Sequence, residues 1–216
     1  EETRALQERL IRYMHRLKIS MVRIMSYAVE LDAQGRALAD QREPERLLRL
    51  ERVCKTFLDA GILPLHENCH TFGGMSWEHS LKLVDKIPGL KLVFDTGNPP
   101  LTHDFRHEFP YPMQSSWKFY QQVKEFVAHV HIKDAIYDRE NKQGIYTFPG
   151  EGDGDVARIV ADLLARGYDG AFSIEPHMAV VFHDASVQSD AKARYENFVT
   201  YGRKWGALFR EAEKQH

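Results

Sequence analysis

Apolar residues recur along the chain with two periods, one typical of helices and one typical of strands. Segment 3–18 places apolar residues at steps of four and three, which predicts one face of an amphipathic helix. These residues are Leu6, Leu10, Tyr13 and Leu17. Similar spacing predicts further helices over residues 44–61, 76–86, 115–126, 155–166 and 190–213.

Short runs of apolar and β-branched residues separate these helices and predict strands. The runs cover residues 19–26, 62–68, 90–96, 127–134 and 171–175, with an additional short strand near 145–148. The alternation indicates an α/β fold in which about six parallel strands are joined by crossover helices. This pattern alone leaves an open sheet and a closed barrel as alternatives. No glycine-rich loop follows the first strand, which disfavours a dinucleotide-binding fold.

Composition and charge restrict the possible functions and leave the predicted fold unchanged. The 216 residues, 43% of them hydrophobic, are expected to form one domain over 1–216. A net charge of −2 provides no basic surface for nucleic acid or an anionic membrane. We find no apolar stretch long enough to span a bilayer, and the two cysteines are too few for a disulfide framework. We therefore expect a soluble, cytoplasmic protein that acts on a small molecule.

Four predicted strands carry a potential metal ligand at or near their C-terminal ends. The ligands are Glu67, Asp95, His131 and Glu175. In a parallel sheet these ends share one edge. Singly, Asp95 is equally typical of a helix cap, and His131 is more often a core histidine. Together, the three carboxylates need a positive charge, and no arginine stands at any of these four strand ends, so a divalent cation is the simplest hypothesis. Oxygen ligands with one imidazole suit Mn²⁺, Mg²⁺ or Co²⁺ better than structural zinc.

The motifs around these residues also carry a family resemblance. In chain order they are "LHENCH", "VFDTGN", "HVHIKD", "GEGDGD" and "SIEPH". The set resembles the xylose-isomerase-like TIM-barrel superfamily of sugar isomerases and epimerases, which also contains the endonuclease IV repair enzymes. The resemblance implies a (β/α)8 TIM-barrel type of fold. It also implies metal binding by Glu67, Asp95, His131 and Glu175, and proton transfer by the two glutamates.

Five further residues are candidates for contact with a substrate. Lys133 and Asp134 resemble a family motif and are expected in or behind the pocket. His70, Asn98 and His177 follow presumed ligands by two or three residues, on loops that would surround the pocket. Each of these three is as readily a polar loop residue as a donor to a sugar hydroxyl.

The sequence departs from the family pattern in two places. Segment 19–26 resembles the third barrel strand, so we expect an N-terminally truncated, incomplete barrel whose open edges are covered by a partner, a homo-oligomer, or in another way. Asn98 stands where the repair enzymes have a histidine, and "GIYTFP" before Gly150 offers no ligand. A trinuclear site and a role in DNA repair are therefore not expected.

These features predict a divalent-metal-dependent isomerase or epimerase of a sugar or related polyol, working through an enediolate. Mn²⁺ is the expected ion, with Mg²⁺, Co²⁺ or Zn²⁺ as alternatives. Two other functions stay open: a metal-dependent dehydratase or lyase acting on a cyclic polyol or hydroxy acid, and a non-catalytic binding or assembly module. The cations Arg106, Lys133 and Arg139 are scattered, which favours an unphosphorylated substrate.

Overall fold

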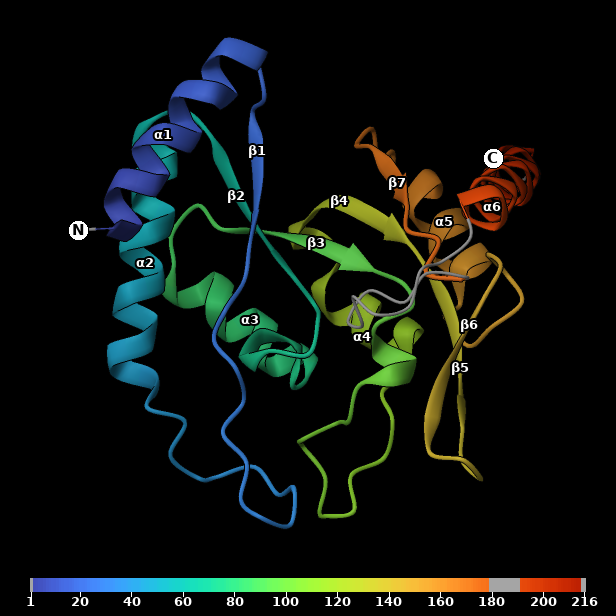
Figure 1. Cartoon of the computed structure of the whole chain (residues 1–216), viewed down its shortest axis with the longest axis horizontal. Coiled ribbons are helices and arrows are strands. Elements are labelled where there is room, and N and C mark those ends of the chain that lie inside the picture. Colours follow the sequence, from blue (N-terminus) through green and yellow to red (C-terminus); the bar gives the residue numbers. More distant parts are fainter. Residues whose placement is uncertain (1, 179–190, 215–216) are drawn as a thin grey trace.

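A curved parallel sheet forms the centre of the molecule. The computed structural model describes residues 2–178 and 191–214. Within them, five parallel strands pair in the order β1 (Met21–Ile24), β2 (Leu63–Glu67), β3 (Lys91–Asp95), β4 (Val127–Ile132) and β7 (Phe172–Ile174). Figure 1 shows β1 near one side of the molecule and β7 near the other. The predicted incomplete barrel of the α/β class is confirmed.

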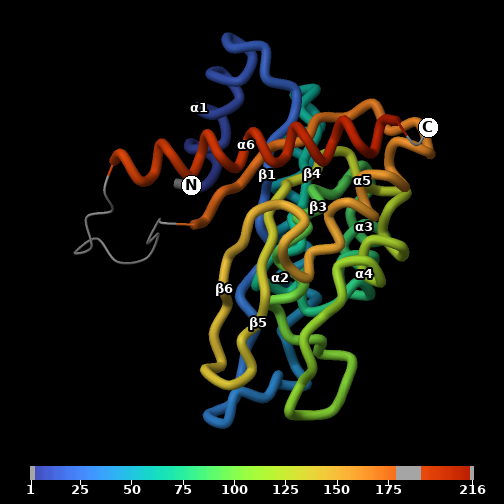
Figure 2. The backbone as a smooth tube through the Cα atoms, turned by 90° about the vertical axis from the view of Figure 1, so that its right-hand side faces the viewer, coloured from blue at the N-terminus to red at the C-terminus, as the bar shows by residue number. Residues whose placement is uncertain are grey.

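The helices lie close to where the apolar periodicity predicts them. They are α1 (Glu2–Leu17), α2 (Glu43–Asp59), α3 (Trp77–Lys86), α4 (Ser116–Val123), α5 (Val156–Ala165) and α6 (Ala191–Glu213), with short 3₁₀ turns at Phe72–Gly74, Pro99–Leu101 and Lys124–Phe126. Figure 2 shows α6 lying across one end of the molecule. None of the described helices has the length and apolar content needed to cross a membrane.

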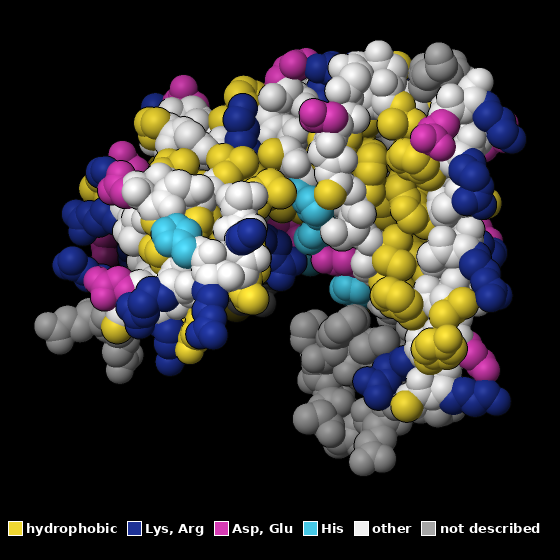
Figure 3. Space-filling model, turned by 90° about the horizontal axis from the view of Figure 1, so that it is seen from above, with side chains coloured by type: hydrophobic (Ala, Val, Ile, Leu, Met, Phe, Trp, Pro, Cys, Tyr) yellow, Lys and Arg dark blue, Asp and Glu magenta, His cyan; other side chains and the backbone are white. Residues whose placement is uncertain are grey.

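The core lies between the sheet and its helices. Alternate strand residues point outward, so Phe94 of β3 packs against Phe119 and Tyr120 of α4, with ring centroids 5.9 and 5.6 Å apart. A second cluster lies between the β1 and β2 side of the sheet and helices α2 and α3, and includes Phe57 and Leu83. The other strand residues point to the concave face. Figure 3 shows that face as a hollow in which histidine and acidic side chains gather.

A strand forms near the predicted residues 145–148, but it is antiparallel and does not join the main parallel sheet. Strand β6 (Gln143–Thr147) pairs antiparallel with β5 (Asp134–Asp138), and this hairpin stands apart from the parallel sheet (Figure 2). The cause is a local turn. The Asp138 carboxylate accepts hydrogen bonds from the backbone N–H groups of Glu140 and Asn141, so the chain reverses before a crossover can form.

The predicted apolar face of α1 is exposed in this structure. Leu6, Leu10, Tyr13 and Leu17 are between 38 and 67% exposed. Instead, Met14 is buried, and Gln7 donates a hydrogen bond to the backbone oxygen of Val53 in α2. The sheet ends at β1, and no described element covers this side of α1. Periodicity identified the apolar face correctly but could not say whether another segment covers it.

Candidate metal centre

The four predicted ligands meet at the C-terminal edge of the sheet. One ligand atom from each of Glu67, Asp95, His131 and Glu175 lies within 4.8 Å of the others. Strand register explains the convergence: Asp95 is paired with His131, and His131 with Ser173, two residues before Glu175. Residues two apart on a strand point to the same side, so all these side chains face the hollow.

His131 joins the two glutamates. Its Nδ1 atom lies 2.9 Å from Oε1 of Glu67 and 2.9 Å from Oε1 of Glu175. Burial alone would lower the pKa of His131, but the hydrogen bonds and charges of the two glutamates raise it to about 9. Burial would conversely raise the pKa of each glutamate, and their hydrogen bonds with His131 hold both below the usual value. Without a metal, this trio is a cation held between two carboxylates.

The two carboxylate oxygens of Asp95 have different partners. Oδ1 accepts hydrogen bonds from the backbone N–H groups of Gly97 and Asn98, at 2.9 and 2.8 Å. Oδ2 is buried and forms an ion pair with Lys133, whose Nζ lies 2.7 Å away. Burial raises the pKa of Asp95 to about 6, against the lowering effect of Lys133. The cap that the sequence suggested is therefore present on one oxygen, while the other oxygen faces the candidate site, and its role as a metal ligand stays a prediction.

Two cations lie against the carboxylates, and the sequence analysis missed one of them. Nη1 of Arg23 lies 2.6 Å from Oε2 of Glu67 and 3.9 Å from Oε1 of Glu175. Lys133 also approaches Glu175, at 3.4 Å. No arginine stands at the four strand ends, as the sequence indicated, but Arg23 reaches the carboxylates from a fifth strand, β1. An arginine within an otherwise apolar strand was the available sequence signal.

The other substrate candidates are distributed unevenly. Nε2 of His177 lies 3.4 Å from Oε2 of Glu175, and its ring is 4.9 Å from that of Tyr146. His70 meets Thr102 with an Nδ1 to Oγ1 distance of 3.4 Å. Asn98 is buried and contributes its backbone N–H to Asp95. Lys133 and His177 thus reach the ligand group directly, whereas contact of any of these residues with a substrate stays a prediction.

Asp134 organises a loop. Its carboxylate oxygens accept hydrogen bonds from the backbone N–H groups of Gly150, Gly152 and Gly154, at 2.8, 3.1 and 2.8 Å. A Cβ atom on Gly152 would stand 2.4 Å from Oδ1 of Asp134, so the close approach requires glycine. The "GEGDG" segment therefore wraps around one buried carboxylate, which leaves Asp134 little capacity for a substrate.

The donor set fits a hard divalent cation. Three carboxylates and one imidazole converge on one point, and hard oxygen donors of this kind suit such an ion. Arg23 and Lys133 already neutralise part of the negative charge, so charge alone is a weaker argument for metal than the sequence suggested.

Comparisons with known proteins agree with this fold. A family model described as a xylose isomerase-like TIM barrel matches residues 1–198. The comparison with curated protein sequences returns no match.

Several solved structures are similar to this chain. A xylose isomerase domain protein from Planctomyces limnophilus has a TM-score of 0.71 and 15% identity, and the match covers 97% of this chain and 67% of that one. A xylose isomerase-like TIM-barrel protein from Mycobacterium smegmatis, in complex with magnesium, has a TM-score of 0.63, 16% identity and coverage of 95 and 67%. A probable 3-DHS dehydratase from Bacillus anthracis has a TM-score of 0.61, 16% identity and coverage of 93 and 69%. Sugar 3-epimerases are also among the similar structures. At these identities the likeness concerns the fold.

Proposed function

Because the chain belongs to the xylose isomerase-like TIM-barrel family, we propose that it is a divalent-metal-dependent isomerase or epimerase of a sugar or related polyol. The observation that carries this proposal is the convergence of Glu67, Asp95, His131 and Glu175 on one point at the C-terminal edge of the sheet. The similarity to sugar 3-epimerases supports the choice of reaction.

These four residues would hold the metal ion. We expect Mn²⁺, and the magnesium in a similar structure makes Mg²⁺ the first alternative. When bound, the ion supplies a Lewis acid that stabilises the negative charge developing on the substrate oxygens during proton removal. Asp95 is a ligand only, because its other oxygen is bound to the backbone of its own loop.

Glu67 and Glu175 are the proposed proton-transfer groups. They contact the same nitrogen of His131 from separate strands, β2 and the end of β7, and their lowered pKa values keep both ionised and able to accept a proton. If one glutamate removes a proton from a carbon and the other, which must then carry a proton taken from solvent, delivers one to the opposite face of that carbon, the result is epimerisation. If one glutamate moves a proton between adjacent carbons, the result is isomerisation.

A metal-dependent dehydratase is the second candidate. The similarity to a probable 3-DHS dehydratase favours it, and the same proton removal would be followed by loss of a hydroxyl group. Deuterium incorporated into recovered substrate without loss of water separates isomerase or epimerase activity from dehydration.

The experiment is incubation of the Mn²⁺-loaded protein in D₂O with a panel of ketoses and inosose-type polyols, followed by NMR. We expect exchange at the carbon beside the carbonyl with one class of compound. Replacing Glu67→Gln or Glu175→Gln should each slow this exchange by about 10²- to 10⁴-fold. Glu78→Gln, on the exposed surface of α3, is the matched control and should leave the rate unchanged. Failure to bind a divalent ion, or no exchange with any compound of the panel, would instead support a non-catalytic binding module. Full activity in Glu175→Gln would contradict the role proposed for Glu175.

A further inference from the structure

Arg23 has more hydrogen-bonding capacity than its contacts use. A guanidinium carries five N–H donors, and in the described structure only Nη1 donates, to Oε2 of Glu67 at 2.6 Å. The side chain is 50% exposed, although Glu67 beneath it is buried. Nε and Nη2 donate no hydrogen bond to the described residues, and half of the side chain is accessible. Their planar fork has the geometry that binds a carboxylate through two hydrogen bonds.

The charges around the centre favour an anionic ligand. Three carboxylates contribute three negative charges, and Arg23 and Lys133 contribute two positive ones. A divalent cation held by the four ligands, with His131 neutral as ligation requires, adds two more positive charges. The loaded centre then carries a surplus of one positive charge, which one monoanionic group would balance.

The groove beside Arg23 also favours an anionic ligand. A groove of about 580 Å³ lies between α1, β1 and α2, within the range of small-molecule sites. Arg23, Arg46 and Arg49 line it, and none of the described lining residues is acidic, although Arg46 is already paired with Glu30 outside the lining. The remaining lining is mostly apolar, with Leu10 and Met25 as examples. Arg23 lines this groove and also contacts Glu67, whereas the four candidate ligands do not line the groove.

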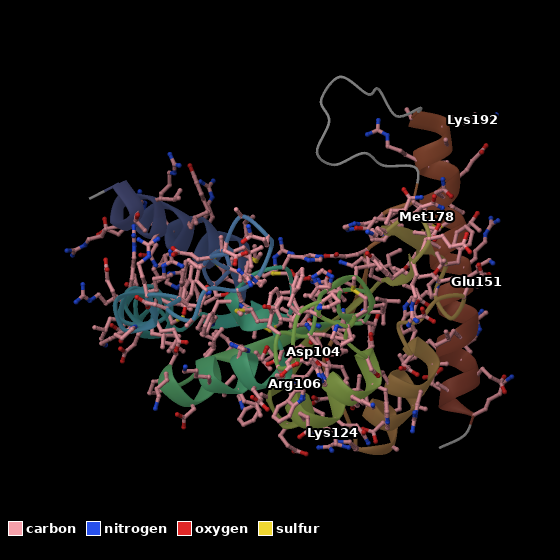
Figure 4. All side chains as sticks on the ribbon, turned by 90° about the horizontal axis from the view of Figure 1, so that it is seen from below. Asp104, Arg106, Lys124, Glu151, Met178 and Lys192 are labelled. Atoms are coloured by element: carbon pink, nitrogen blue, oxygen red, sulfur yellow. The ribbon has the colours of Figure 1, made fainter. Side chains whose placement is uncertain are left out.

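Arg106 is another cation that could bind an anion, but its donors are already used within the protein. Arg106, labelled in Figure 4, donates to both carboxylate oxygens of Asp104, at 2.8 and 2.5 Å. Its fork is therefore satisfied within its own loop. Among these arginines, Arg23 combines free donors with a position at the centre.

We propose that Arg23 binds a carboxylate of the substrate, so that the chain acts on a polyhydroxylated or keto carboxylic acid in preference to a neutral sugar. This inference rests on the proposed function and specifies its substrate class. A carboxylate fits better than a phosphate, because a single planar fork and one surplus charge match a monoanion. Lys133, close to Asp95 and Glu175, adds to the positive potential on the opposite side of the ligand group.

The test compares D-gluconate with D-glucitol, which share the same carbon chain and differ at one end by a carboxylate in place of a CH₂OH group. Each is titrated into the Mn²⁺-loaded protein by isothermal titration calorimetry. We expect gluconate to bind at least about tenfold more tightly, as a charge-assisted pair of hydrogen bonds would give. In Arg23→Gln this preference should fall below about threefold, and in Arg23→Lys, which keeps the charge but not the fork, it should be intermediate.

Arg52→Gln is the matched control, because Arg52 is exposed on α2 and does not line the groove. It should keep the preference for gluconate. Mn²⁺ titration of Arg23→Gln shows whether the variant is folded, since the ion should bind at least as tightly once a competing cation is removed. Equal binding of the two probes, no binding of gluconate, or a preference that survives in Arg23→Gln overturns the inference. If neutral ketoses nevertheless exchange deuterium when Mn²⁺ is bound, the proposed function stands without the inference about Arg23.

Discussion

The Nδ1 atom of His131 lies at 2.9 Å from an oxygen of each of two glutamates, and a metal ion would need the same three groups. A proton on the imidazole and a metal ion therefore compete for one place. The two glutamates stabilise the protonated ring enough to raise its pKa to about 9, despite its burial. Because the proton and the metal ion compete, the affinity for metal should be lower where His131 is protonated.

We predict that Mn²⁺ binding releases a proton at neutral pH. Below pH 9 the imidazole of the metal-free protein is protonated, and ligation requires the neutral form, so the apparent affinity should rise by about tenfold per pH unit between pH 7 and 9. Above pH 9 the increase should level off. Calorimetry in buffers of different ionisation enthalpy measures the released proton directly.

His129→Gln is the control for this measurement. His129 lies on the same face of β4, and its Nε2 is 2.8 Å from Oγ of Ser173, outside the ligand group. Proton release should persist in this variant. An affinity that is flat from pH 7 to 9 would contradict the assigned charge state of His131.

Helix α1 shows how one element can be amphipathic without being buried on its apolar side. Met14 is buried and Gln7 bonds to α2, while Tyr13 and Leu17 of the apolar stripe are more than half exposed. Large exposed apolar surfaces usually mark an interaction site. The homo-oligomer expected from the sequence stays a prediction, and α1 is where its interface can be tested.

We predict unequal effects of two alanine substitutions in α1. Met14→Ala should lower the free energy of unfolding by about 2 to 4 kcal/mol, because the side chain is 7% exposed and its removal leaves a cavity. Leu17→Ala should change it by less than about 0.5 kcal/mol, because that side chain is 67% exposed. Urea denaturation measures both. A Leu17→Ala effect as large as that of Met14→Ala, together with a change in sedimentation, would mean that a second copy covers the stripe in solution.

The ligand group ties together strands that are far apart in sequence. Glu67 belongs to β2, and Glu175 follows β7 at the opposite part of the sheet, while β1 and β7 are both edge strands among the described residues. A metal ion bound by four strands should therefore stabilise the whole sheet. An ion that binds only the folded chain adds free energy of unfolding by mass action.

We predict that Mn²⁺ at about one hundred times its Kd raises the free energy of unfolding by about 2.7 kcal/mol, or the Tm by about 5 to 10 °C. Excess EDTA should reverse this. In Asp95→Asn the increase should be largely lost, because the variant removes a charged ligand. Asp59→Asn is the control, since that carboxylate pairs with Lys55 on the surface. An equal increase in both variants would place the ion elsewhere.

Much of the fold and of the site was accessible from the sequence, because the relevant information is local. Helical spacing and apolar runs located the helices and the parallel strands to within a few residues. The ligands follow directly from this, since Glu67, Asp95 and Glu175 stand at strand ends and the C-terminal ends of parallel strands meet at one edge. Motifs in a fixed order then indicated the family.

Contacts between distant segments were decided only by the tertiary structure. Which face of α1 is covered, and whether segment 134–147 joins the sheet or turns back as a hairpin, depend on pairing that local periodicity does not encode. Likewise, Arg23 meets Glu67 across 44 residues because β1 and β2 are neighbours in register. The sequence by itself indicated which four residues converge at the candidate metal centre. The folded chain decided which charges oppose one another, because electrostatic interactions depend on distance in space and not on separation along the chain.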